Sequence, residues 1–383
     1  MPQTAIYLDH NASSPLLPEA RSALLAGLEL VGNPSSVHGH GRALHELIER
    51  GRDAVAQLAG AERQQVVFTG SATEAIHQAI VGGVRALRLD GVVVSAGEHP
   101  AVLKAAELSG APVTTLPLDA AGRVSLGALS EQLAAADTTG TTLLVAIQAV
   151  NNETGVCQDL VALAALVGPT RHYLFIDAVQ AFGKLPMEFA SNAADMMAIS
   201  GHKIGAPVGV GALLMKAPCD EVRLLQGGGH EQGRRAGTQS AALIAAFGAA
   251  AAAFPAHYAA ERQRGLLAQL EASLHEMAPD IVIFGAGATR VGNVVNFAVP
   301  GLRASVAMMG LDLLGLSVSS GSACSSGKVG PSHVLEAMGV SPELAECALR
   351  VSLGWSSTGT DVTAFLSGFG VVLGRQRRQV KAA

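Results

Sequence analysis

The feature that most constrains this chain is a series of short apolar runs rich in β-branched residues, separated by longer stretches with helical periodicity. The runs lie at residues 66–68, 92–94, 143–147, 173–176, 196–199 and 211–215. Strands that are apolar throughout are typical of a sheet buried on both faces, and the helical stretches supply the cover. The pattern predicts an α/β fold with a largely parallel sheet.

The chain of 383 residues is too long for one ordinary core, since domains average about 150 residues. A charged helix predicted at residues 261–276 leads from the α/β region into a smaller unit of short strands and helices. We therefore place the domain boundary near residue 256. The predicted large domain is 16–255, and the small domain comprises 1–15 and 256–383 and carries a Ser/Gly-rich, cysteine-containing loop at about 319–332 that we expect to be mobile.

Composition excludes several classes of protein. With 49% hydrophobic and 15% charged residues, the chain can bury enough apolar surface to fold, so it is not a disordered protein. Its longest small-apolar run, residues 241–254, is shorter than the roughly 20 residues of a spanning helix. The N-terminus lacks the pattern of a secretory signal. These features predict a soluble cytoplasmic protein without a membrane segment.

Charge and cysteine spacing narrow the choice further. A net charge of −5 gives no general attraction to nucleic acid, so no direct nucleic-acid partner is expected. The four cysteines show neither C-x-x-C spacing nor a dense framework, which argues against structural zinc and disulfides. We expect no metal site.

Polar residues follow the predicted strands, at the edge where open α/β sheets bind ligands. After the strand at residues 66–68, Gly70 permits a turn, and Ser71 to Thr73 offer N–H groups and hydroxyls at a helix N-terminus. This arrangement suits a phosphate group. An ordinary helix cap is the alternative interpretation.

A carboxylate and a lysine follow two further strands. Asp177 and Gln180 come after residues 173–176, and Ser200, His202 and Lys203 come after residues 196–199. Among six lysines, Lys203 alone has this setting, in which an amine can form a Schiff base, although an ordinary surface lysine is the alternative.

Together, a phosphate site, a carboxylate and a lysine are the parts that pyridoxal 5′-phosphate requires. An aspartate beside a protonated pyridine keeps the ring an electron sink. His99, which follows the strand at residues 92–94, is placed to stack on the ring, unless it is only a loop histidine.

One cysteine differs from the other three in its surroundings. Cys324 lies in a polar Ser/Gly-rich segment with Lys328 nearby, a setting typical of a reactive thiolate. Cys157 and Cys219 lack this context, and Cys347 lies in a predicted helix, where a buried structural thiol is the better interpretation. A rigid loop whose cysteine only packs is the alternative for Cys324.

With these motifs in hand, the chain resembles the cysteine desulfurases of the NifS/IscS type, within the fold-type I, class V aminotransferases. The matching motifs run in order from Tyr7-Leu8-Asp9 to the segment 350–354. The most specific are 151–155, Ser200-Gly201-His202-Lys203, 227–231 with 235–238, and 319–324. The resemblance implies a seven-stranded, mostly parallel sheet in the large domain and a smaller α+β domain.

The same resemblance implies a homodimer with pyridoxal 5′-phosphate on Lys203, Asp177 at the pyridinium nitrogen and His99 over the ring. Asn152 and Gln180 would approach the ring oxygen. The implied phosphate ligands are Ala72, Thr73, Ser200 and His202, joined by Thr238 of the partner subunit.

For the reaction, the resemblance implies that Arg350 holds the carboxylate of L-cysteine, with Asn152 helping. A guanidinium can bind a carboxylate through two parallel hydrogen bonds. Cys324 would then attack the sulfur of cysteine bound to the cofactor, giving a persulfide and releasing alanine.

The chain departs from the family pattern at Gln232, Trp355 and Val329-Gly330, none of which makes or breaks a bond. Selenocysteine lyase, C–S lyase and aminotransferase activities on the same scaffold stay open, as does a catalytically silent sulfur-relay or interaction module. The sulfur-acceptor protein also stays open, with an iron–sulfur cluster assembly scaffold or a thiolation enzyme as candidates.

Overall fold

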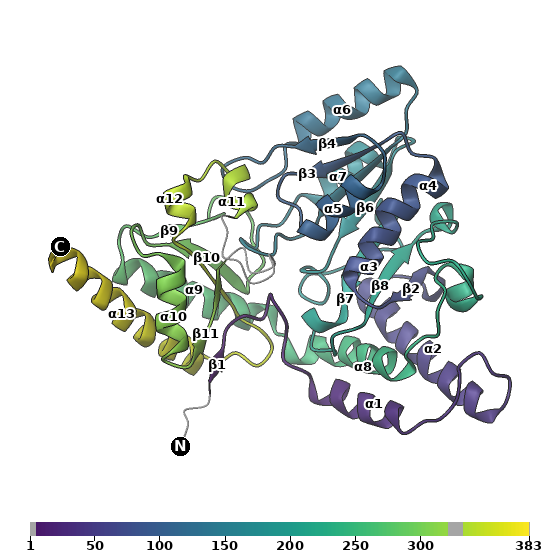
Figure 1. The fold of residues 1–383 in the computed structure, drawn as a ribbon, viewed down its shortest axis with the longest axis horizontal. Helices are drawn as coiled ribbons and strands as arrows, with labels where there is room; N and C mark the ends of the chain where they lie inside the picture. The colour runs from purple at the N-terminus through teal and green to yellow at the C-terminus, as the bar shows by residue number, and fades with distance from the viewer. Residues whose placement is uncertain (1–4, 321–331, 383) are drawn as a thin grey trace.

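A seven-stranded sheet forms the centre of the larger part of the computed structural model, which describes residues 5–320 and 332–382 (Figure 1). The strand order is β2-β8-β7-β6-β5-β3-β4. The strands are β2 (Val66–Thr69), β3 (Gly91–Ser95), β4 (Val113–Leu116), β5 (Leu143–Gln148), β6 (Tyr173–Asp177), β7 (Met196–Ser200) and β8 (Gly211–Met215). Only β8 runs antiparallel to its neighbours, β2 and β7. The predicted seven-stranded, mostly parallel sheet is confirmed.

Alternate residues of each strand enter cores on opposite faces of the sheet. In β6, Leu174 and Ile176 join the core that α2, α6, α7 and α8 cover, whereas Phe175 joins the core beneath α3, α4 and α5. The helices of this part are α1 (Pro18–Leu28), α2 (Gly39–Ala59), α3 (Ala72–His77), α4 (Gly83–Leu87), α5 (Pro100–Leu108), α6 (Leu126–Thr139), α7 (Leu160–Val167) and α8 (Ala241–His257). Burial on both faces explains why the strands are apolar throughout.

A second, smaller unit follows α8 and has its own sheet and core. Its four strands pair antiparallel in the order β12-β13-β10-β9. Its elements are α9 (Ala260–Met277), β9 (Val282–Ile283), β10 (Val294–Ala298), α10 (Ala304–Asp312), β11 (Leu316–Ser317), β12 (Ser319–Ser320), α11 (His333–Ala337), α12 (Pro342–Ala345), β13 (Ala348–Ser352) and α13 (Gly359–Ala382).

The N-terminal segment lies with this smaller unit. β1 (Ile6–Tyr7) pairs parallel with β11 (Figure 1). Leu8 is part of the unit's core. The chain also turns sharply, by 65°, where α8 gives way to α9. Separate sheets and cores support the division we place near residue 256, which stays a prediction.

Within residues 5–320 and 332–382, none of the helices taken singly has the length and apolar character to cross a membrane. One bent pair, Ala241–His257 with Ala260–Met277, meets those criteria jointly.

Candidate active site

A cavity of about 350 Å³ lies at the carboxyl ends of β5, β6 and β7, which are Gln148, Asp177 and Ser200. Of the predicted site residues that the structure describes, all but Thr238 line it. Those residues are Ala72, Thr73, His99, Asn152, Asp177, Gln180, Ser200, His202, Lys203 and Arg350. Cys324 and Lys328 lie outside the described residues. The structure thus brings the predicted residues together, and their roles stay predictions.

One end of the cavity is formed by the start of α3. Ser71 is the residue before this helix, and its Oγ accepts a hydrogen bond from Glu74 N at 3.2 Å. The first N–H groups of a helix have no partner within the helix, so those of Ala72 and Thr73 are suited to an anion. His202, from the neighbouring strand end, lies here too, with Nδ1 3.3 Å from Ser13 Oγ.

Asp177 is a buried carboxylate whose charge is poorly compensated within the chain. Its Oδ1 accepts a hydrogen bond from Val179 N at 3.0 Å. Burial raises the pKa of Asp177 to about 6, against the opposing effects of that hydrogen bond and of Lys203. A cationic group bound beside it would restore the ionised form. The protonated nitrogen of a pyridine ring is such a group.

Lys203 reaches the cavity from the short helical turn after β7. Its Nζ donates hydrogen bonds to the backbone oxygens of Asn11 at 2.6 Å and Ala12 at 2.8 Å. The amine is therefore held at the sheet edge by the N-terminal segment. Sequence reasoning did not single out Asn11, which lies two residues after the Tyr7-Leu8-Asp9 motif.

His99 is held in one orientation at the N-terminus of α5. Its Nδ1 accepts a hydrogen bond from Ala101 N at 3.1 Å, so in the neutral ring the proton is on Nε2. Burial, followed by the charges of Lys203 and His333, lowers the pKa of His99 to about 4. The ring facing the cavity is therefore uncharged at neutral pH.

Arg350 enters the cavity from β13, in the smaller unit. Its Nη2 donates to Asp9 Oδ1 at 2.8 Å and its Nη1 donates to Asn152 O at 3.1 Å. Its Nε is buried and has no hydrogen-bond partner in the part of the chain that the structure describes. A buried donor without an acceptor is costly, so this side of the guanidinium is suited to an anionic ligand.

The three described cysteines are poor nucleophiles. Burial raises the pKa of Cys157 to about 11 and that of Cys219 to about 12, and it also raises that of Cys347. All three thiols are therefore protonated at neutral pH. The prediction that Cys347 lies in a helix is wrong, because α12 ends at Ala345 and β13 begins at Ala348, but the thiol is buried as expected.

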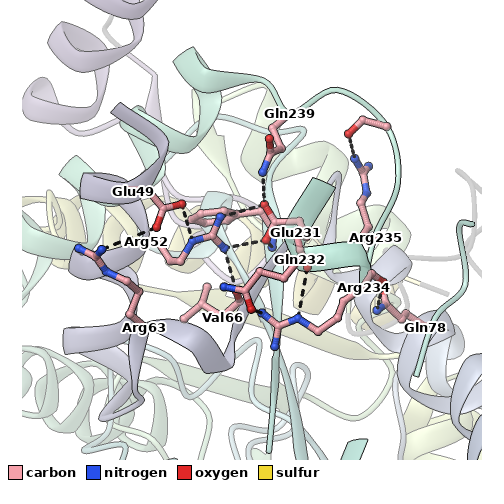
Figure 2. A network of polar contacts seen from close by, with 12 residues as sticks. Glu49, Arg52, Arg63, Val66, Gln78, Glu231, Gln232, Arg234, Arg235 and Gln239 are labelled. Carbon is pink, nitrogen blue, oxygen red and sulfur yellow. Dashed lines mark hydrogen bonds and ion pairs between the residues drawn. The ribbon is translucent and has the colours of Figure 1, made fainter. Parts of the chain in front are cut away.

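Thr238 lies outside the main cavity, on the loop between β8 and α8. Figure 2 shows the buried ion pair between Arg52 and Glu231 that holds this loop. Glu231 accepts hydrogen bonds from Arg52 Nη1 at 2.6 Å, Arg52 Nη2 at 3.0 Å and Phe68 N at 2.9 Å. Glu231 and Gln232 both have left-handed backbone conformations, with φ of 49° and 56°. Thr238 lines a separate cavity of about 120 Å³. Its predicted role toward a partner subunit is therefore not tested within one chain.

Besides Gln232, the chain departs from the family pattern at Trp355, which the structure describes, and at Val329-Gly330, which it does not. Trp355 is half-buried, with Nε1 donating to Pro15 O at 3.0 Å, and its side chain packs against the core of the large part. Val329 and Gly330 lie outside the described residues.

Comparison with known proteins adds the family context. Residues 6–365 match the aminotransferase class-V family. The chain is 36% identical over 392 residues to the IscS-like cysteine desulfurase of Mycobacterium tuberculosis, with 98% of each chain covered. The structure is similar to that of a NifS-like protein from Rickettsia africae, with a TM-score of 0.88, 29% identity and coverage of 97% of this chain and 99% of that one. It is also similar to SspA in complex with cysteine, with a TM-score of 0.80, 28% identity and coverage of 92% and 99%.

Proposed function

The chain belongs to the aminotransferase class-V family and is, within it, a cysteine desulfurase, and on this premise we propose how its residues divide the work. The reaction converts L-cysteine to L-alanine and passes the sulfur to a thiol of the enzyme and then to an acceptor protein. The observation that carries the proposal is the convergence of Lys203, Asp177 and Arg350 on one cavity.

The cavity residues fit pyridoxal 5′-phosphate. Asp177 supplies a buried carboxylate for the ring nitrogen, and Lys203 supplies the amine that holds the cofactor covalently. The N-terminus of α3, with Ser200 and His202, is suited to the phosphate. When bound, this cofactor acts as an electron sink for negative charge that develops at the substrate carbon.

The remaining cavity residues orient the ring and the substrate. Asn152 and Gln180 lie near the proposed position of the ring oxygen, and neutral His99 covers the face of the ring. Arg350 binds the substrate carboxylate through Nε, which donates no hydrogen bond to any described residue. Because Asp9 and the Asn152 carbonyl fix the guanidinium, little side-chain entropy is lost on binding.

The sulfur acceptor within the enzyme is Cys324 in this proposal. The Cβ–S bond of the substrate breaks, an S–S bond forms at Cys324, and the carbon skeleton leaves as alanine with a proton in place of sulfur. The attacking species is the thiolate. Cys157, Cys219 and Cys347 do not compete, because their thiols are protonated and wholly or partly buried.

The proposed assembly is a homodimer in which Thr238 serves the site of the partner subunit. Apolar side chains are exposed at the end of α1 and in the segment leading to α2, with exposed fractions of 65% for Leu28, 77% for Val31 and 89% for Val37. Such a cluster is typical of a surface that another protein covers. Ser35 Oγ lies 3.0 Å from His230 Nε2, so the loop that carries Thr238 lies beside this segment and would reach the interface when a second copy covers it.

The function is tested with purified protein, pyridoxal 5′-phosphate and L-cysteine. Borohydride reduction followed by peptide mapping should label Lys203, and mass spectrometry should find the persulfide on Cys324 with release of alanine. Cys324→Ala should still bind the cofactor and yield neither product. Label on Lys184, or a persulfide on Cys157, Cys219 or Cys347, would contradict the assignment, and sulfide release at the wild-type rate by Cys324→Ala would favour the C–S lyase.

A further inference from the structure

A second lysine lies behind the proposed cofactor site. Lys184, in the turn after β6, is buried, with an exposed fraction of only 7%. Its Nζ donates hydrogen bonds to Gln180 Oε1 at 2.8 Å and to Asn11 Oδ1 at 3.2 Å. Both acceptors are neutral amide oxygens, so these hydrogen bonds do not neutralise the ammonium charge.

The charges around Lys184 are also unfavourable. Burial, followed by the positive charges of Lys203 and Arg350, lowers the pKa of Lys184 to about 7. Burying an amine among cations costs stability, and replacement by an apolar side chain of similar length would remove that cost. The position of this lysine therefore calls for a role in the site.

That role follows from the donors and acceptors of the two amides. The ammonium form of a lysine has only donors, so it requires the oxygen of Gln180 to face Lys184 and the NH₂ group of Gln180 to point the other way. One N–H of Gln180 Nε2 donates to Asn11 O at 3.0 Å. The other is left for the cavity, which Gln180 lines. Rotation of the amide by half a turn would place NH₂ against the ammonium and present an acceptor to the ligand.

Asn11 is fixed by the same reasoning. Its Oδ1 accepts from Lys184 and from Asn293 Nδ2 at 3.1 Å, so its Nδ2 points to the carbonyl of Asn152, at 3.1 Å. The backbone oxygen of Asn11 accepts from both Gln180 and Lys203. Lys184 therefore orients one amide that faces the cofactor site and one residue that holds the amine of Lys203.

We propose that Lys184 is a positioning residue, which fixes the amide of Gln180 as a hydrogen-bond donor toward the ring oxygen of the cofactor. The inference rests on the proposed function, since it assumes pyridoxal 5′-phosphate in this cavity. It adds a residue whose contribution passes through Gln180 rather than through contact with the ligand.

The test is a double-mutant cycle on cofactor affinity, measured by titrating cofactor-stripped protein with pyridoxal 5′-phosphate. Lys184→Met should raise the dissociation constant about tenfold in the wild-type background. In the Gln180→Ala background the same change should raise it less than about twofold, because the amide that Lys184 orients is absent. Lys104→Met, on the surface of α5, is the matched control and should change neither value.

Three results would overturn the inference. Equal losses in both backgrounds would mean that Lys184 acts independently of Gln180, and an unchanged dissociation constant in Lys184→Met would mean that it does not act on the site. If Lys184→Met does not fold, Lys184→Leu replaces it, and retention of wild-type affinity by that variant, whose side chain has no hydrogen-bond donor, would also contradict the role. Failure of the wild-type protein to bind pyridoxal 5′-phosphate would instead overturn the proposed function, and with it this inference.

Discussion

At the scale of single residues, the cavity contains buried polar groups whose hydrogen-bond partners among the described residues are incomplete. Asp177 accepts a hydrogen bond from one backbone N–H, and Arg350 keeps a buried Nε without an acceptor in the described part of the chain. Burying such groups without partners lowers the stability of the fold. Their positions indicate that a ligand supplies the missing partners, and two predictions follow from this.

The first prediction concerns Asp177→Asn. The raised pKa of Asp177, about 6, means that its ionised form destabilises the cofactor-free protein, and that this cost disappears as the pH falls below the unfolded value of about 4. The asparagine variant should therefore be more stable than wild type by about 3 kcal/mol at pH 7.5 and by less than about 1 kcal/mol at pH 4. Its affinity for pyridoxal 5′-phosphate should fall by about one to two orders of magnitude.

Urea unfolding of both cofactor-free proteins across this pH range, with cofactor titrations at pH 7.5, would measure the two effects. Comparison of the two proteins at each pH cancels the titration of every other group. A stability difference that does not change with pH would show that Asp177 is not the group that titrates near 6.

The second prediction concerns Arg350→Lys. A lysine keeps the positive charge but lacks the two parallel N–H donors of a guanidinium, so it cannot bind the substrate carboxylate through two hydrogen bonds. The KM for L-cysteine should rise at least tenfold, while the dissociation constant of the cofactor changes less than threefold. Steady-state kinetics and cofactor titration give the two values. Equal loss of cofactor and substrate binding would mean that Arg350 has a structural role through Asp9.

At the scale of elements, the apolar runs predicted six of the seven strands of the main sheet. The seventh, β4, was not predicted because it is a partly exposed edge strand whose Val113 and Thr115 face solvent, so it has no continuous apolar run. The stretch after β2 is helical, as its periodicity predicted, but residues Gln78–Gly82 form a π-helical segment between α3 and α4. Periodicity alone cannot reveal this widening. The π-helical segment coincides with contacts to a distant part of the chain, because buried Gln78 donates to the backbone oxygens of Val222 and Arg234.

The third prediction belongs to the loop between β8 and α8. Glu231→Gln should remove the fully buried carboxylate that pairs with Arg52 and leave that guanidinium only its contact with the partly exposed Glu49, at a cost of about 3 kcal/mol in the free energy of unfolding. The matched control is Glu221→Gln, which removes an exposed ion pair with Arg223 and should change stability by less than about 1 kcal/mol. Urea unfolding of the two variants compares them directly. Equal stability changes would mean that the Arg52–Glu231 pair does not fix the loop.

At the scale of the whole molecule, sequence reasoning identified the residues that follow strands, because the edge of a parallel sheet brings such residues together. It did not identify the contacts of Asn11 or Lys184 with the site. Asn11 lies on an N-terminal segment that is far from Lys203 in sequence. Lys184 is four residues from Gln180, but only the structure shows that the turn between them brings the two side chains into contact. These contacts depend on how the two units and the N-terminal segment pack, which no local pattern encodes.

The fourth prediction concerns assembly. Val31→Asp should convert the proposed homodimer to a monomer, because it places a carboxylate in the exposed apolar cluster between α1 and α2. Cofactor affinity should fall at the same time, since Thr238 would no longer reach the partner subunit. Val161→Asp, on the exposed face of α7, is the control, with an exposed fraction of 81% in the starting residue. Sedimentation analysis that finds the wild type monomeric, or Val31→Asp dimeric, would contradict the role of this surface.

The hydrogen bonds of the N-terminal segment also determine the order in which parts of the protein can fold during translation. The side chains of Asp9 and Asn11 accept hydrogen bonds from Arg350 and Asn293, which are synthesised about three hundred residues later. The main sheet, whose last strand ends at Met215, has all its strands long before then and can fold as a unit. The pocket that would receive the cofactor is thus completed only when translation has nearly finished, so a nascent chain stalled before Arg350 emerges should retain the sheet and lack the finished binding site.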